Sequence, residues 1–215
     1  MNKKLYIFIL LLLFYSMYGK EIDLEKVNVN GPLEKIIQNR RSTRDYSLKP
    51  ISFKDLSYIL WAAQGITSKE GFRTTPSAGA LYPIEIYIMA NRVENLATGI
   101  YKFIPQKNSV VAISSKNIIT NLYEAALRQD CIIKAPLVIV IGVVFDRVTA
   151  KYGARGTNYT YIEAGCVAQN IHLMAENLGL GTVVVGAFYD DRVKILFEMQ
   201  KNETPVILMP VGYKK

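Results

Sequence analysis

The 215-residue sequence has few of the residue types from which many active sites are built. It contains one histidine, His172, and two cysteines. These cysteines have no CxxC spacing and cannot complete a zinc site with one histidine, so we predict no metal site. Ser-His-Asp or Cys-His catalysis would have to use His172, which lies among apolar residues of an expected helix, where a structural role is favoured. Cys131 and Cys166 could pair in an oxidising compartment, but two free, mostly buried thiols are favoured.

Phosphate-binding loops are also missing. No GxGxxG or GxxxxGK[ST] pattern occurs, and the Gly179–Gly181 segment follows an expected helix and precedes an expected strand, the reverse of the dinucleotide-binding order. The formal charge is +8, but the basic residues are scattered and no basic run is interleaved with aromatics, so we predict no nucleic-acid partner. A bound cofactor would have to supply any demanding chemistry.

The N-terminus is charged and then apolar. Lys3 and Lys4 precede an apolar run over residues 5–18, which is short for a membrane span but typical of a secretory signal. We predict that residues 1–19 direct export to the periplasm or the medium, although Met17 stands where a small residue is usual before cleavage. The alternatives are a buried first helix or an uncleaved anchor, which would be the only contact with a membrane. Removal of these residues would reduce the charge to +6.

The remainder is predicted to be an extended leader, residues 20–30, and one domain, residues 31–215. Periodicity and turn signals predict helices and strands without strict βαβ alternation, which indicates an α+β fold. The expected helices start at Pro32 and Ser52 and span 118–127, 158–178 and 190–197. The expected strands are 84–89, 99–104, 109–113, 136–145, 182–185 and 206–211.

The strongest positive signal is the segment Arg40-Arg41-Ser42-Thr43-Arg44. If it is extended, Arg40, Ser42 and Arg44 point to one side and Arg41 to the other. Two guanidinium groups and a hydroxyl on one side would suit a phosphate or an anionic ring edge. The alternative is an ordinary basic helix terminus.

Three further segments accompany it: Pro76-Ser77-Ala78-Gly79-Ala80-Leu81-Tyr82-Pro83, Glu163-Ala164-Gly165-Cys166-Val167-Ala168-Gln169-Asn170 and Gly179-Leu180-Gly181-Thr182-Val183-Val184-Val185-Gly186. In this order and spacing, the four segments resemble the FMN-dependent nitroreductase superfamily over residues 33–213. The last two segments resemble the SagB-type branch, whose members dehydrogenate thiazolines and oxazolines in peptide natural products. Cys166 departs from this pattern, because the family usually has histidine there.

The resemblance implies a central, mainly antiparallel sheet flanked by helices, with FMN at a homodimer interface. Segment 40–44 would contact the FMN phosphate and the pyrimidine edge, loop 76–79 would reach the flavin across the dimer, and residues 185–187 would border the reactive part of the ring. A C-terminal lysine would substitute for a basic phosphate contact. The implied cofactor-binding residues are Arg40, Arg41, Ser42, Arg44, Pro76, Ser77, Ala78, Gly79, Val185, Gly186, Ala187 and Lys214 (or Lys215).

The pair Lys151-Tyr152 precedes the long expected helix. The resemblance to the SagB-type branch implies that it abstracts a proton from an azoline ring, and a lysine desolvated near another cation could serve as the base. The alternative is an exposed loop lysine and a packing tyrosine. We therefore expect an FMN-dependent oxidoreductase that transfers two electrons, as hydride, between flavin and a small organic substrate. The alternatives are a NAD(P)H-dependent nitro or quinone reductase and a non-catalytic flavin-binding protein.

Overall fold

The strand predicted from the apolar run after Pro136 is β4 (Leu137–Val143), and all seven of its residues are buried. It lies inside a six-stranded sheet of order β3-β2-β1-β4-β6-β5, in which every neighbouring pair is antiparallel. The other strands are β1 (Ile84–Ala90), β2 (Gly99–Ile104), β3 (Ser109–Ser114), β5 (Leu180–Thr182) and β6 (Thr204–Tyr213). This computed structural model describes residues 21 and 23–215, so the predicted signal or anchor, residues 1–19, lies outside the described residues. The predicted α+β fold with an antiparallel sheet is confirmed.

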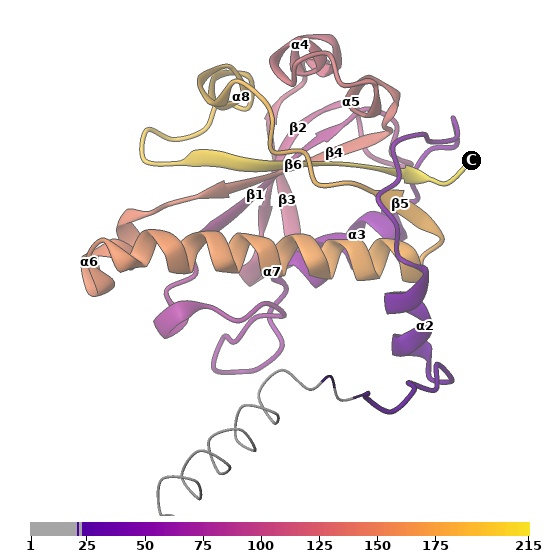
Figure 1. The fold of residues 1–215 in the computed structure, drawn as a ribbon. Coiled ribbons are helices and arrows are strands. Elements are labelled where there is room, and N and C mark those ends of the chain that lie inside the picture. Colours follow the sequence, from indigo (N-terminus) through magenta and orange to yellow (C-terminus); the bar gives the residue numbers. More distant parts are fainter. Residues whose placement is uncertain (1–20, 22) are drawn as a thin grey trace, which may run out of the picture. The chain divides into compact units, whose positions relative to one another are not determined.

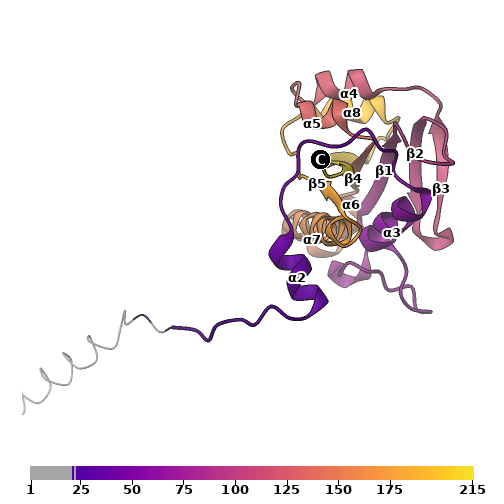
Figure 2. The same ribbon diagram turned by 90° about the vertical axis from the view of Figure 1, so that its right-hand side faces the viewer.

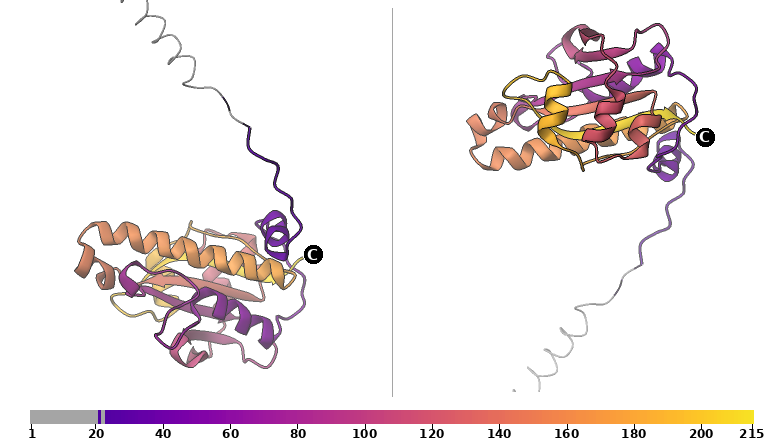
Figure 3. Two further views of the ribbon diagram at one scale, coloured as in Figure 1. Left: turned by 90° about the horizontal axis from the view of Figure 1, so that it is seen from below. Right: turned by 90° about the horizontal axis from the view of Figure 1, so that it is seen from above.

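Helices cover both faces of the sheet (Figure 1). Ile86 of β1 faces the layer of α3 (Phe53–Gln64) and α7 (Arg155–Asn177), whereas Met89 of β1 faces the opposite layer. That opposite layer contains α4 (Ile119–Ala125), α5 (Asp130–Lys134) and α8 (Asp190–Leu196). Figure 2 shows the layers from the side, and Figure 3 shows α3 beside α7 from below and α4, α5 and α8 from above. Alternating strand residues therefore build two cores, one on each face.

Local signals in the sequence set several helix ends. The Ser52 hydroxyl accepts a hydrogen bond from the Asp55 backbone N–H at 3.0 Å, which is the predicted N-cap of α3. Gly179, with a φ of 71°, follows the last turn of α7 in the left-handed conformation that glycine adopts at low cost. Residues 21 and 23–30, the described part of the predicted leader, form no helix or strand.

Other predictions need correction. The long helix starts at Arg155 and not at residue 158, and two short helices, α5 and α6 (Asp146–Tyr152), were not predicted. Strand β5 spans 180–182 rather than 182–185. The predicted helix α2 (Pro32–Asn39) forms and packs on α7, but none of its residues is fully buried and only Ile36 is half-buried. No described helix is long and apolar enough to cross a membrane.

Candidate cofactor and active site

The basic segment that follows α2 docks along the edge of the sheet. Ser42 bridges in parallel to Thr182 at the end of β5, and the Thr43 N–H donates to the Thr182 carbonyl oxygen at 2.9 Å. A Cβ on Gly181 would lie 2.5 Å from the Thr43 side chain, so glycine permits this approach. The buried Tyr46 donates its hydroxyl to the Thr43 carbonyl oxygen at 2.6 Å. Neutral residues therefore hold the segment in place.

The arginines of this segment differ in their partners. Arg41 donates from Nη1 to the carbonyl oxygens of Gln38 (2.7 Å) and Arg40 (2.8 Å), so this nitrogen caps the end of α2. Within the described part of the chain, the side chains of Arg40 and Arg44 make no hydrogen bond or ion pair. These two arginines flank the exposed Ser42 in sequence, and guanidinium and hydroxyl groups are donors that suit an anionic cofactor.

The two unpaired arginines have buried titratable neighbours. Burial, reinforced by the charge of Arg40, lowers the pKa of His172, which is consistent with the predicted structural role of this histidine. Burial raises the pKa of Cys131, and the charge of Arg44 opposes that rise. Because His172 belongs to α7 and Cys131 to α5, the segment crosses the sheet edge between the two helical layers. Both cysteines are free, as predicted; Cys131 is buried and Cys166 partly exposed.

Residues 185–187 lie beside the middle of β6. Val185 exchanges two backbone hydrogen bonds of 2.9 Å with Leu208, which fixes its position. Gly186 and Ala187 are exposed, and no atom lies within 4 Å of a Cβ placed on Gly186. Gln129, which was not predicted, donates from Nε2 to the Ala187 carbonyl oxygen at 2.9 Å. An open strip of backbone therefore follows an anchored residue, which leaves space for a planar group.

The loop predicted to contact flavin meets the Lys151-Tyr152 pair. Gly79 has a φ of 61°, and a Cβ on it would lie 2.7 Å from Tyr152 Oη and 3.0 Å from Lys151 Nζ. Ser77 shapes the loop, because its hydroxyl accepts from the Tyr82 backbone N–H at 2.9 Å. Lys151 lies in the last turn of helix α6 rather than in a loop, and its side chain is exposed in the single chain.

A groove of about 300 Å³ runs between this loop and α7, and Glu163 lies at its wall. Glu163 is 3% exposed, and neither carboxylate oxygen has a hydrogen-bond partner among the described residues. Burial raises its pKa to about 7, while the nearby Ser77 hydroxyl and Arg73 guanidinium oppose the rise. Sequence reasoning assigned no role to Glu163, although a carboxylate on the apolar face of a helix is a signal that could have singled it out.

The sequence pattern of the Nitroreductase family matches residues 37–213 of this chain. The chain belongs to the nitroreductase family. It is 45% identical over 192 residues to a predicted nitroreductase of Methanocaldococcus jannaschii, which covers 89% of this chain and 94% of that relative. The protein is therefore a nitroreductase-family enzyme.

Two other similarities bear on the fold and the branch. The solved structure of a predicted nitroreductase from Ralstonia eutropha superimposes with a TM-score of 0.76 at 25% identity, covering 91% of this chain and 88% of that one. The microcin B17-processing protein McbC of Escherichia coli is 28% identical over 147 residues. That match covers 65% of this chain and 54% of McbC, about half of its length.

Within one chain, the arginines predicted to bind the cofactor and the Lys151-Tyr152 pair predicted to act in catalysis lie at two separate places. His172, beside Arg40, is 17 residues further along α7 than Arg155, which follows Lys151 and Tyr152 closely. This corresponds to roughly 25 Å along the helix axis. Lys214, the predicted phosphate contact, pairs with Glu176, so its charge is already compensated. No group of potential metal ligands occurs among the described residues.

Proposed function

We propose that this nitroreductase-family oxidoreductase binds FMN and transfers two electrons, as hydride, between the flavin and a small organic substrate. The observation that carries the proposal is the pair Arg40 and Arg44, two guanidinium groups without partners among the described residues, at the edge of β5. Unpaired cations held by a rigid edge favour an anionic ligand, because no competing carboxylate has to be displaced.

The residues at this edge fit FMN. Arg40, Ser42 and Arg44 would hold its phosphate and the pyrimidine edge of its ring, and the exposed strip that ends at Ala187 has space for the ring face. When bound, FMN supplies a ring that accepts or donates hydride. A fixed guanidinium beside the pyrimidine edge would stabilise negative charge there without reorganisation, and Gln129 would keep the strip in position.

The substrate would lie near Lys151 and Tyr152. Their side chains touch the loop at Gly79, and we propose for them the proton-abstracting role known in SagB-type dehydrogenases, which would take an azoline or a similar heterocycle. The partial similarity to McbC supports this assignment. The second candidate is a NAD(P)H-dependent reductase of nitro compounds or quinones, which the 45% identity to a predicted nitroreductase favours.

We also propose that the enzyme is a homodimer. The predicted cofactor-binding edge and the loop at Gly79 lie far apart along α7, so a second copy is needed to bring such a loop to the cofactor. Exposed apolar side chains are available for the interface: Leu33 and Ile37 of α2 are 58% and 54% exposed, and Trp61 is 41% exposed. Export remains our proposal for residues 1–19, supported by their charged start and apolar run.

Flavin binding is tested by adding FMN to the purified full-length protein and recording its visible spectrum and fluorescence. We expect Arg44→Ala to weaken FMN binding at least about tenfold, because one charge-assisted contact is lost. Arg41→Ala removes the same charge from the neighbouring helix cap and is the matched control, expected to change affinity less than about threefold. A wild-type protein that takes up no FMN, or equal effects of the two variants, would contradict the proposal.

The two reactions are separated by anaerobic reduction of the flavin. The dehydrogenase would be supported if an azoline bleaches the flavin in the wild type and in Arg155→Ala but not in Lys151→Ala. Arg155→Ala is the control, because it removes a nearby exposed cation. Bleaching by NAD(P)H that is insensitive to Lys151→Ala would support the reductase. A bound flavin inert to both reagents would indicate a binding protein.

A further inference from the structure

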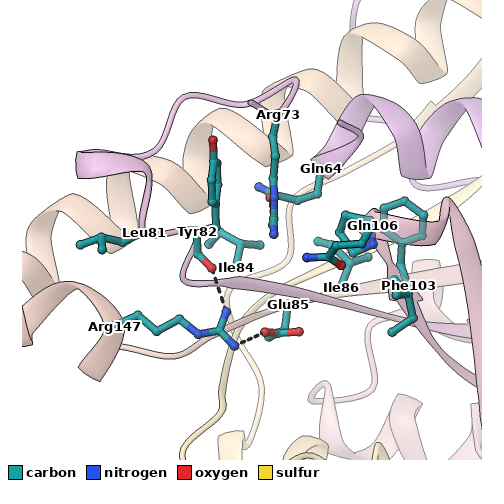
Figure 4. Close-up of a pocket in the computed structure, with 12 residues that line it drawn as sticks. Gln64, Arg73, Leu81, Tyr82, Ile84, Glu85, Ile86, Phe103, Gln106 and Arg147 are labelled. Atoms are coloured by element: carbon teal, nitrogen blue, oxygen red, sulfur yellow. Dashed lines mark hydrogen bonds and ion pairs between the residues drawn. The ribbon is translucent and has the colours of Figure 1, made fainter. Parts of the chain in front are cut away.

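A second cavity, with a volume of about 310 Å³, lies away from the predicted cofactor edge (Figure 4). It opens between the end of α3, the start of β1, the turn after β2 and the start of α6. None of the residues predicted from sequence to bind a cofactor or to act in catalysis lines it. Small-molecule sites usually have volumes of about 300–1,000 Å³, so this cavity suits a small ligand.

The charges on one side of the cavity are fully paired. Arg147 contacts Glu85 and also donates to the Tyr82 carbonyl oxygen at 2.8 Å. The other oxygen of Glu85 is 3.0 Å from Lys102 Nζ, and Lys102 is 2.7 Å from the buried Glu203. Glu85 therefore has two cationic partners, one on each oxygen.

Arg73 is the cation of the cavity wall that forms no ion pair among the described residues. Its guanidinium stacks over the Tyr82 ring, 4.3 Å from the ring centre, and its Nη1 donates to Gln64 Oε1 at 2.6 Å. Its guanidinium is partly buried, and Glu85 and Glu163 attract its charge without forming an ion pair with it among the described residues. A carboxylate in the cavity would give this charge a direct partner.

Gln64 supplies a second, independent observation. Its side chain is 0% exposed, yet its Nε2 has no hydrogen-bond partner among the described residues. Figure 4 shows Gln64 and Arg73 side by side at the wall, with Tyr82 on the other side of Arg73. A buried amide without an acceptor is uncommon, because it costs about 1–3 kcal/mol. The Gln64 Nε2 group therefore lacks an acceptor beside the Arg73 guanidinium.

We propose that this cavity binds a small organic anion through its carboxylate, which Arg73 receives while the apolar body rests on the wall formed by Ile84, Ile86 and Phe103. One unpaired guanidinium matches one carboxylate, and its planar fork allows two parallel hydrogen bonds. The three wall residues are buried and apolar, which favours an organic acid over inorganic phosphate. The exposed Gln106 lies at the mouth, on the turn after β2.

Ligand-observed NMR titration of the full-length protein with cyclohexanecarboxylate tests the site. Its neutral isostere, cyclohexanecarboxamide, has the same shape without the charge. We expect the carboxylate to bind at least about tenfold more tightly than the amide. Equal affinities, or no binding of the carboxylate at about 10 mM, would overturn the proposal.

Two variants locate the site. Arg73→Gln should weaken carboxylate binding at least about tenfold, whereas Lys107→Gln, which removes one charge from the adjacent exposed turn outside the cavity lining, should change it less than about twofold. Gln106→Trp should fill the mouth and abolish binding without altering the core, and it keeps the test decisive if Arg73→Gln does not fold. Binding that persists in Gln106→Trp, or that falls equally in Lys107→Gln and Arg73→Gln, would place the anion elsewhere.

Discussion

Replacing Glu163 by glutamine is expected to change how the stability of the protein depends on pH. This carboxyl group is 3% exposed and has no hydrogen-bond partner among the described residues, so its charged form is poorly solvated. Burial raises its pKa to about 7, against an ordinary value of 4.5. Glutamine has nearly the same shape and remains neutral at every pH of interest.

The sign follows from the protons bound in each state. The unfolded chain releases the Glu163 proton near pH 4.5 and the folded protein near pH 7, so the folded state holds more protons between these values. The contribution of this group to stability is therefore complete below pH 4.5, falls as the pH rises, and is lost above about pH 7. The shift from 4.5 to about 7 corresponds to at most about 3 kcal/mol.

Urea unfolding at pH 5 and pH 8, at one fixed protein concentration, measures this effect. The wild type should lose up to about 3 kcal/mol more than Glu163→Gln between the two pH values. The depressed pKa of the buried His172 acts in the opposite direction but equally in both proteins, so it cancels from the difference. Glu34→Gln makes the same chemical change at an exposed position of α2 and is the control. Parallel pH profiles for wild type and Glu163→Gln would refute the reasoning.

Three further predictions concern packing and polar contacts. Gly79→Ala places a methyl group 2.7 Å from the Tyr152 hydroxyl in a left-handed conformation, and calorimetry should show a loss of about 1–3 kcal/mol. Tyr87→Phe removes the donor that is 2.6 Å from the buried Glu203 carboxylate and should cost about 1–3 kcal/mol in urea unfolding; an unchanged midpoint would contradict this. Gly181→Ala pushes the basic segment off β5 and should weaken FMN binding in fluorescence titrations. Its effect on the melting temperature should be the smaller of the two when both are expressed as free energies.

Local signals in the sequence were sufficient to predict most strands of the sheet. The apolar run at β4, the hairpin of β2 and β3, and the cap at Ser52 each depend on residues close in sequence. The start of α7 was missed because Gly153 and Gly156 look like loop residues. Gly153, with a φ of 57°, does separate α6 from α7, but Gly156 lies inside α7, where a Cβ would be 2.8 Å from the Thr149 backbone. Close packing of two helices, which sequence does not show, requires that glycine.

The cofactor edge was predicted from four ordered segments, but its details required the fold. The C-terminus of α2 uses Nη1 of Arg41, whereas the side chains of Arg40 and Arg44 make no hydrogen bond among the described residues. Gln129 supports residue 187 from 58 positions away, and Arg73 lies beside Gln64 only because the loop after α3 turns back. Such contacts join residues that have no periodic relation in the sequence.

The separation of the predicted parts along α7 limits what one chain can do. The arginine edge lies near His172, and the loop at Gly79 lies near the start of the same helix, so a ligand held at one is far from the other. Motif order in a sequence gives no sign of this, because it does not tell which copy of the chain supplies each part. If the activity needs both parts, it should disappear with dissociation of the proposed dimer. The exposed apolar face of α2 would then be as necessary for turnover as the arginines that follow it.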